Sequence, residues 1–362
     1  MTRAPEDPTL DEAFRLSPAQ RRALLDLAHA AAQQIGLLNA LSAARASPRS
    51  VASLARDLSV APRRLLRLLE ALALDSVVER LGGRPRPERA SDEHARATRS
   101  ASSTGSAGSA GAARWRVGPA LHDVAFSMAR RAPDGEGWAR LCQVLRADHP
   151  LPPLSTDEQE RYHGHLLRAG AAPGCALARL IGPVDRLLDA GGGLGAYTLA
   201  YLRAHPSARA VIVDSAAVCP AAAQVLVDAG LSRRAVALAA DLRAPSPEER
   251  RRCVEGGRFD AAILCNVLHL HEARDAARIV SSVASLLRRG GRLFVKDLRI
   301  AADRSGPADA VLFALGMAIY TDGGDVHPPE LLHRSMRAAG LADVREESLA
   351  GFADSIVLRG TA

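Results

Sequence analysis

The sequence has very little lysine. Lys296 is the only lysine among 47 lysine and arginine residues, and the arginines are mixed with 40 acidic residues. Together with abundant Ala, Gly and Pro, this composition is typical of codon bias in a GC-rich genome and indicates a bacterial source. The net charge of +7 is therefore not evidence for nucleic-acid binding.

Long apolar runs and paired cysteines are also missing. No stretch of about 18 uncharged apolar residues occurs, and the N-terminus is acidic and broken by prolines, so we expect no membrane span and no signal peptide. The five cysteines lack any CxxC spacing, which is typical of free thiols in a reducing compartment. These absences predict a soluble, cytoplasmic protein.

The first third of the sequence has the spacing of a helix-turn-helix. Apolar residues recur at helical spacing from Leu16 to Leu41; a helix is then predicted to begin near Ser50, and a second one, after a turn at 58–61, to end near Leu74. The short strands SVVERL and RWRVG fit the two arms of a wing. Residues 84–113 between them are rich in Ser, Gly and Ala, so we expect a disordered tip.

The second of these helices decides between DNA binding and internal packing. Its exposed candidates are Arg63, Arg64 and Arg67, but the run LLRLLEALAL is apolar almost all round. A helix that reads a DNA groove needs a row of polar side chains to reach the base edges. We therefore expect this helix to be buried against another chain or domain, and residues 1–125 to form a homodimerisation domain without a nucleic-acid partner.

From about residue 176 the sequence alternates between apolar strands and helices. Continuous apolar strands separated by helices are typical of a parallel sheet covered on both faces. We predict a doubly wound, Rossmann-like α/β domain over residues 176–362, with a ligand site beyond the carboxyl ends of the strands. The predicted strands are 186–190, 208–214, 235–241, 259–268 and 291–300, and the helices between them include 197–204 and 274–287.

The first of these strands leads into a turn made largely of glycine. Asp189 is followed by Gly191, Gly192, Gly193 and Gly195, and such glycines let a ligand lie against the main chain where a strand turns into a helix. The spacing is GxGxG, whereas dinucleotide-binding proteins have GxGxxG. By itself the turn does not identify the ligand.

Acidic residues stand at the ends of the next two strands. Asp214 ends the second strand, where a carboxylate can accept both hydroxyls of a ribose, and Asp241 ends the third, within reach of an adenine edge. Asp260 opens the fourth strand, where we expect a structural role. An acid at a strand end can instead cap the next helix. Acids in register at successive strand ends favour a nucleoside ligand.

These motifs resemble a known family. The runs LLDAGGGLGAYTLA, RFDAAILCNVLHLHEARD and YTDGGDVHPPELL are similar to the class I S-adenosylmethionine-dependent methyltransferases, and most of all to the small-molecule O-methyltransferases related to plant caffeate and bacterial polyketide enzymes. The resemblance covers nearly the whole chain, because that family has an N-terminal winged-helix dimerisation domain. It implies S-adenosylmethionine as cofactor, a small-molecule acceptor, and a helical linker and substrate lid at residues 126–175.

The resemblance also assigns residues to the cofactor. It implies that the methionine part lies against Gly191 and Gly193, that Asp214 binds the ribose, and that Asp241 with Leu242 lies beside the adenine. The expected cofactor-binding residues are Asp189, Gly191, Gly193, Gly195, Asp214, Ser215, Asp241, Leu242 and Asn266.

In the family pattern the catalytic base falls on His269 and the acid that orients it on Asp297. Methyl transfer from a sulfonium needs an aligned acceptor that has lost its proton. An imidazole can take a phenolic proton near pH 7, and a nearby carboxylate fixes its tautomer. The alternative is a histidine that caps a strand end, and the glycine turn favours catalysis.

Two departures from the family pattern affect this interpretation. Leu270 and His271 stand where many relatives have Asp-Trp, so the packing beneath the adenine is expected to differ. Val326 stands where the plant enzymes carry a glutamate. The histidine and acid pair must then suffice, or the acidity of the acceptor must lower the barrier.

Two histidine pairs are candidate metal ligands. His163 and His165, and likewise His269 and His271, would share a face if they lay on strands. No third ligand has a suitable spacing, and methyl transfer needs no Lewis acid. We expect no metal.

The acceptor pocket is expected between the domains. An apolar pocket with aromatic side chains suits a phenol or a polyketide-like metabolite, but it also suits a thiol or an amine. Most apolar residues at helical spacing are ordinary core residues. The expected substrate-binding residues are Trp138, Tyr162, Met317 and Tyr320, with Phe126, Met128 and Phe313 as further candidates.

Three functions remain open from the sequence. The first is an O-methyltransferase of specialised metabolism. The second is an enzyme of this fold that binds S-adenosylmethionine for a reaction other than methylation, such as decarboxylation or hydroxylation, since one fold hosts many chemistries. The third is a DNA-binding regulator that senses a nucleoside.

Overall fold

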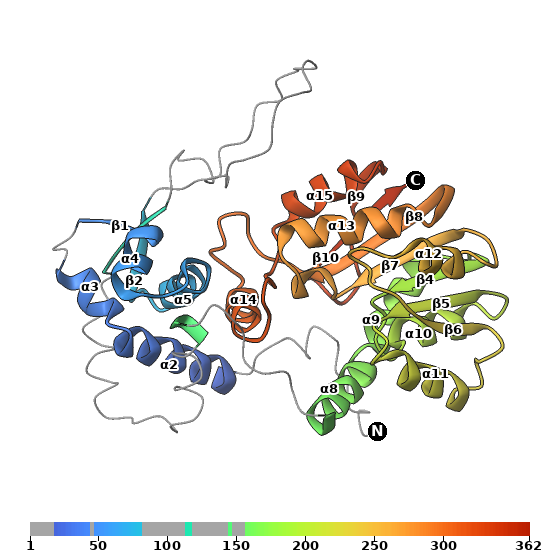
Figure 1. The fold of residues 1–362 in the computed structure, drawn as a ribbon, viewed down its shortest axis with the longest axis horizontal. Coiled ribbons are helices and arrows are strands. Elements are labelled where there is room, and N and C mark those ends of the chain that lie inside the picture. The colour runs from blue at the N-terminus through green and yellow to red at the C-terminus, as the bar shows by residue number, and fades with distance from the viewer. Residues whose placement is uncertain (1–17, 44–46, 82–112, 118–143, 147–155) are drawn as a thin grey trace, which may run out of the picture. The chain divides into compact units, whose positions relative to one another are not determined.

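The computed structural model of the chain describes residues 18–43, 47–81, 113–117, 144–146 and 156–362. It divides into two compact units, one made of residues 25–146 and one made of residues 1–24 and 147–362 (Figure 1). The domain limits that we predict at residues 125 and 175 stay predictions. Apart from Ala113, the predicted disordered tip lies outside the described residues.

The helical periodicity near the N-terminus corresponds to two helices. They are α2 (Pro18–Gln34) and α3 (Leu37–Ala43). Gly36 separates them with a φ of +79°, a left-handed conformation that glycine adopts without steric penalty.

The predicted helix-turn-helix is confirmed at the predicted residues. Helix α4 (Val51–Leu58) begins after Ser50, whose side chain accepts a hydrogen bond from the amide of Ser53, and helix α5 (Pro62–Leu74) begins with proline. Strands β1 (Arg49–Ser50), β2 (Val78–Leu81) and β3 (Arg114–Val117) form a sheet in the order β1-β3-β2. Because β2 and β3 pair antiparallel, the two predicted arms do lie together.

The expected exposure of two arginines on α5 is wrong. Arg64 and Arg67 are buried, with 5% and 7% of their surface exposed. Arg64 Nη1 donates to the carbonyl of Val144 at 3.1 Å, and Arg67 Nη1 lies 2.5 Å from Glu70 Oε2. Since both guanidinium groups have partners inside the unit, α5 packs internally with its leucines, as its apolar pattern predicts.

The larger unit is built on a seven-stranded sheet. Its strands are β4 (Arg186–Ala190), β5 (Arg209–Asp214), β6 (Ala235–Ala239), β7 (Phe259–Cys265), β8 (Leu287–Leu298), β9 (Ala342–Glu346) and β10 (Ser355–Thr361). Their order is β6-β5-β4-β7-β8-β10-β9. Neighbours from β6 to β8 pair parallel, whereas β10 pairs antiparallel with both β8 and β9. The predicted doubly wound sheet is therefore present.

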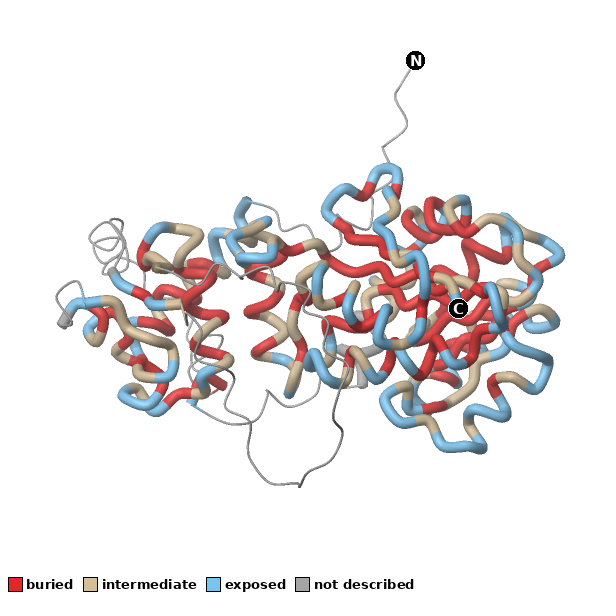
Figure 2. Tube along the Cα trace, turned by 90° about the horizontal axis from the view of Figure 1, so that it is seen from above, coloured by how far each residue is buried: buried red, intermediate tan, exposed pale blue. Residues whose placement is uncertain are grey.

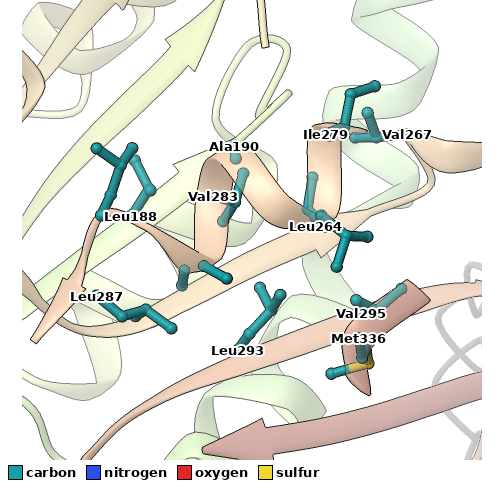
Figure 3. Packing of buried hydrophobic residues seen from close by; sticks show 14 of the residues in the cluster. Leu188, Ala190, Leu264, Val267, Ile279, Val283, Leu287, Leu293, Val295 and Met336 are labelled. Carbon is teal, nitrogen blue, oxygen red and sulfur yellow. The ribbon is translucent and has the colours of Figure 1, made fainter. Parts of the chain in front are cut away.

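Helices cover both faces of this sheet. On one face, α13 (Ala273–Ala284) and α15 (Pro329–Ala338) pack on the apolar cluster drawn in Figure 3. On the other face, α9 (Ala171–Ile181), α10 (Ala196–Ala204) and α11 (Cys219–Asp228) bury a second cluster. The strands run through the buried part of this unit (Figure 2), which explains their continuous apolar sequences. The remaining helices are α8 (Thr156–Ala169), α12 (Pro247–Cys253) and α14 (Ala308–Tyr320).

Several predicted strand limits differ from the structure, among them the start of β5 at Arg209 and the end of β8 at Leu298. Strand β6 ends at Ala239, and β7 ends at Cys265 because Asn266 has a φ of +59° and the chain then enters a short 3-10 helix, η1 (Leu268–Leu270). Strand β8 begins four residues earlier than expected, at Leu287. Each difference lies at a strand end, where the chain turns. The apolar pattern predicts the middle of a strand better than its ends, because turn residues follow no apolar period.

Two further features concern the described residues alone. Cys175, Cys219, Cys253 and Cys265 are free thiols. No helix in this part of the chain combines the length and the apolar character needed to cross a membrane.

Replacing the Ser50 cap tests the helix-turn-helix. A Ser50→Ala variant loses the side-chain acceptor for the amide of Ser53, so we expect unfolding of the unit to require about 1 kcal/mol less free energy. Denaturant unfolding followed by circular dichroism measures this. The control is Ser281→Ala, an exposed serine within α13, where the free energy should change by less than about 0.5 kcal/mol; equal effects of both changes would contradict the capping role.

Candidate active site

A cavity of about 730 Å³ lies at the carboxyl ends of β4, β5, β6 and β7. This is the edge where parallel α/β sheets bind ligands. All the residues that we predict for the cofactor line it except Gly195, which closes the glycine turn at the start of α10. His269 lines the same cavity.

The glycine turn after β4 needs glycine for two different reasons. Gly191, Gly193 and Gly195 have φ values of +71°, +54° and +85°, which disfavour any other residue. A Cβ on Gly191 would lie 2.5 Å from Val267 Cγ2, and one on Gly195 would lie 2.7 Å from Ile212 Cδ1. A Cβ on Gly193 would meet nothing within 4 Å. The main chain is therefore tightly packed at Gly191 and Gly195, and it faces open space at Gly193.

Asp189 lies beneath this turn. It is 1% exposed and accepts a hydrogen bond from Thr198 Oγ1 at 2.7 Å. Burial raises its pKa from 3.8 to about 6, although the hydrogen bonds from Thr198 lower the value and the charge of Asp214 raises it slightly. The carboxylate thus keeps a negative charge at neutral pH in a site that disfavours it, which suits a cationic ligand group.

Asp214, at the end of β5, is fastened to the glycine turn. Its Oδ2 accepts the amide of Gly193 at 2.8 Å, and its Oδ1 accepts the amide of Ser215 at 2.7 Å. A carboxylate has about four acceptor positions, so two bonds leave capacity for ligand hydroxyls. The contact joins the glycine turn to the end of β5, the two elements to which the family resemblance assigns the methionine and ribose parts of the cofactor.

Asp241 is held by an arginine that sequence reasoning missed. Arg243 donates to it from the backbone amide at 2.9 Å, from Nε at 3.1 Å and from Nη2 at 3.0 Å. These bonds lower the pKa of Asp241 below its usual value. Arg243 and Leu242 also line the cavity. The only signal in the sequence is an arginine two residues after the acid.

Asn266 joins the cavity wall to neighbouring elements. Its Nδ2 lies 3.4 Å from the hydroxyl of Tyr197, and its Oδ1 accepts from Lys296 Nζ at 3.3 Å. Lys296 is 1% exposed. Tyr197 lines the cavity and was also missed, because a tyrosine at the start of an apolar helix carries no ligand signal.

His269 and Asp297 form a buried pair. Nδ1 of His269 lies 2.6 Å from Asp297 Oδ1, and the His269 amide donates to Oδ2 at 3.2 Å; each residue is 2% exposed. Burial alone would raise the pKa of Asp297, but the charge and hydrogen bond of His269 and the amide of Leu298 lower it below its usual value. Because an ionised carboxylate only accepts, Nδ1 carries a proton, and in the neutral form of the ring Nε2 is the lone-pair nitrogen that can act as a base.

Of the four residues predicted to bind the acceptor, the structure describes the side chains of two and places neither in the wall of this cavity. Met317 and Tyr320 lie on α14 but do not line the cavity of His269, and Tyr320 is 60% exposed. Trp138 and the side chain of Tyr162 lie outside the described residues. Phe313 does reach the site, because its ring packs edge-on against His269 with centroids 5.0 Å apart.

The strand geometry that we considered for the histidine pairs is wrong. His163 and His165 lie within helix α8, and His269 lies in η1 with His271 directly after it. Residues two apart on a helix point in different directions. Within the described ranges, no three His, Cys, Asp or Glu side chains gather as a metal site.

The buried Asp189 predicts a pH effect on stability. Between pH 3.8 and about 6 the folded protein keeps a proton on Asp189 that the unfolded chain releases, so this contribution falls as pH rises through the window. Relative to Asp189→Asn, which keeps an acceptor for Thr198, the wild type should lose roughly 2 kcal/mol of unfolding free energy between pH 4 and pH 7. Urea unfolding of both proteins across this range measures it, and a difference independent of pH would contradict the burial effect.

Comparison with known proteins finds relatives of the larger unit. The family model of the O-methyltransferase domain matches residues 176–341. Among curated proteins, 3-hydroxy-5-methyl-1-naphthoate 3-O-methyltransferase of Streptomyces sahachiroi is 28% identical over 58% of this chain and 61% of its own length. Acetylserotonin O-methyltransferase of Bos taurus is 27% identical over 49% of each chain. The chain thus spans about half to three fifths of the length of these curated relatives.

Solved structures extend the similarity over nearly the whole chain. The O-methyltransferase family 2 protein of Planctomyces limnophilus, solved in complex with apigenin, has a TM-score of 0.68 at 20% identity and covers 97% of this chain and 98% of its own. The mitomycin 7-O-methyltransferase MmcR has a TM-score of 0.51 at 20% identity, with 95% and 96% covered. These likenesses confirm the predicted class I methyltransferase fold. Residues 176–341 thus match the model of the O-methyltransferase domain family, and the chain as a whole is similar in fold to solved O-methyltransferases.

Proposed function

We propose that the protein is an S-adenosylmethionine-dependent O-methyltransferase that acts on a small phenolic or polyketide-like metabolite. The observation that carries this proposal is a single cavity lined by a left-handed glycine turn, by acids at the ends of β4 and β5, and by His269, whose Nδ1 is bonded to Asp297 behind it. Each part suits one requirement of methyl transfer: a place for the donor, compensation of its charge, and a base for the acceptor.

The cavity fits the cofactor that the family implies. Gly191 and Gly193 would hold its methionine part, Asp214 with Ser215 its ribose, and Asp241 with Leu242 its adenine. When bound, the cofactor supplies an electrophilic methyl group on a sulfonium. The open space at Gly193 is the physical basis for the fit, because a Cβ there would fill the cradle. Asp189, Gly195 and Asn266 complete the proposed set by shaping the turn and the wall beside it.

Asp189 has a further role in this proposal. Its buried carboxylate is destabilised by the lack of water, so a cationic group placed against the turn recovers free energy that the folded protein otherwise lacks. The amine and sulfonium of S-adenosylmethionine are cationic groups of this kind. Ligand binding would therefore favour the ionised form of Asp189.

His269 would remove the proton of the acceptor hydroxyl. Nε2 takes the proton while Asp297 holds Nδ1 and stabilises the imidazolium that forms. Val326 is fully buried and apolar, so it adds no second carboxylate beside the base. Phe313 packs against the imidazole ring and helps to fix its orientation. In this proposal the pair His269–Asp297 carries the proton step.

The acceptor class follows from the base and from the relatives. An imidazole paired with a carboxylate matches the acidity of a phenol better than that of an aliphatic alcohol. The names of the relatives contain a hydroxynaphthoate and acetylserotonin, and one structural neighbour was solved with apigenin. Met317, Tyr320, Tyr162 and Trp138 remain proposed substrate contacts.

The smaller unit is proposed to be a winged-helix dimerisation domain. Its helix-turn-helix with two paired strands supports this, and the burial of Arg64 and Arg67 disfavours α5 as a DNA-reading helix. A homodimer, a cytoplasmic location and a bacterial source stay predictions from the sequence.

Removing the proposed base tests the assignment. A His269→Ala variant should bind S-adenosylmethionine within about threefold of the wild type but lose about 10²- to 10⁴-fold in kcat on a phenolic acceptor. Calorimetry measures the binding, and mass spectrometry of the methylated product with quantification of S-adenosylhomocysteine measures turnover. The matched control is His333→Ala, a histidine of α15 outside the cavity, which should keep near wild-type turnover.

The same assay separates the alternatives. Unchanged turnover in His269→Ala would refute the base assignment. Cofactor binding without any S-adenosylhomocysteine across a panel of phenols, thiols and amines would point instead to a reaction other than methylation.

A further inference from the structure

The turn that carries His269 is held by a second segment, residues 321–327. The backbone carbonyl of His269 accepts the amide of Asp325 at 2.8 Å. The carbonyls of Leu268 and His271, on either side of it, both face the Nε2 atom of His327, at 3.0 Å and 3.1 Å. Three carbonyls around the proposed base are thus bonded to one short stretch of chain.

His327 is the centre of this arrangement. It is 4% exposed, and because both partners of Nε2 are carbonyl oxygens, Nε2 carries a proton and donates to both. Burial lowers the pKa of His327, although Asp297 and Asp325 raise it, so the ring is neutral and has a single N–H. That N–H bridges the two ends of η1, and His269 lies between them.

The segment is itself fastened to the loop after β8. Arg304 donates from Nη2 to Asp325 Oδ1 at 2.7 Å and from Nη1 to the carbonyl of Val326 at 2.9 Å. Strand β8 also carries Asp297 near its end. Asp297 holds the imidazole through its side chain, and Arg304 holds the segment that bonds to the backbone of His269. Both residues lie at the carboxyl end of β8 or just after it.

Two glycines bring the backbones close enough for these bonds. A Cβ on Gly324 would lie 2.6 Å from the carbonyl oxygen of His269, and one on Gly323 would lie 2.9 Å from the amide nitrogen of Glu272. No side chain fits between the two segments at these points. The spacing of the segments is fixed by direct backbone contact.

We propose that His327 is a positioning residue for His269. Its bifurcated hydrogen bond keeps η1 in the conformation that places His269 Nδ1 on Asp297. A displacement of about 1 Å at a reacting group can reduce the rate about 10²-fold. In this chain the segment would thus support the base through its backbone, at the place where Val326 offers no carboxylate. The catalytic consequence rests on the proposed function, but the structural role does not.

The first test needs no ligand. Hydrogen–deuterium exchange of the full chain is compared for the wild type, His327→Ala, His327→Gln and His333→Ala, and the peptide covering residues 266–272 is followed. This peptide contains the amides of Leu270 and His271, which bond within η1 at 3.1 Å each. We expect exchange about tenfold faster in His327→Ala and little change in the other two variants, since glutamine keeps a donor. Unchanged exchange in His327→Ala, or an equal rise throughout strands β4 to β8, would overturn the proposal.

The second test uses turnover. With S-adenosylmethionine and a panel of phenols, His327→Ala should lose about 10- to 100-fold in kcat while the KM for the cofactor changes less than about twofold, and His327→Gln should recover most of the loss. A nitro-substituted phenol that is already ionised at the assay pH needs no base, so its loss should be at least fivefold smaller. Equal losses on both kinds of acceptor would show general damage and refute the positioning role.

The two levels of the account can fail separately. If the wild type converts no acceptor and binds no cofactor, the proposed function is wrong, and the exchange measurement still decides what His327 does. If the wild type is active and His327→Ala resembles it in both kcat and exchange, the positioning role alone is wrong.

Discussion

The 2.6 Å contact between His269 and Asp297 depends on one constraint, the parallel pairing of β7 and β8. The two residues follow or end neighbouring strands whose carboxyl ends meet at the same edge of the sheet. That edge also carries the glycine turn after β4 and Asp214 at the end of β5. A one-residue slip in register would turn each side chain to the opposite face. The apolar strands therefore fix the chemistry of the cavity as well as the core beneath it.

Much of this arrangement was predictable from the sequence, because it depends on local patterns. Apolar runs gave the five parallel strands nearest the site, and the glycines and strand-end acids marked the residues that line the cavity. The early end of β7 was not predictable. It depends on the left-handed backbone of Asn266, which leads into the packing of Val267 against the bare main chain of Gly191, a contact between segments about 75 residues apart in the sequence.

The residues that were missed have partners elsewhere in the chain. Arg64 looked exposed because its acceptor, the carbonyl of Val144, is 80 residues away. His327 carried no signal, since its role appears only when its segment lies against η1. Tyr197 lies in an apolar helix and reaches the cavity through the fold alone. Sequence patterns thus located the site, whereas the hydrogen bonds that orient its groups required the structure.

The central claim is that the glycine turn cradles the cofactor, and calorimetry of a matched pair of variants tests it most directly. Gly193 and Gly230 both have positive φ values, +54° and +70°, and a Cβ on either meets nothing within 4 Å, so Gly193→Ala and Gly230→Ala carry a similar backbone penalty. Only Gly193 lines the cavity. The account predicts one site for S-adenosylmethionine per chain, an affinity at least tenfold weaker in Gly193→Ala, and an affinity within about twofold of the wild type in Gly230→Ala. No heat of binding in the wild type, or equal affinities in the two variants, would contradict it.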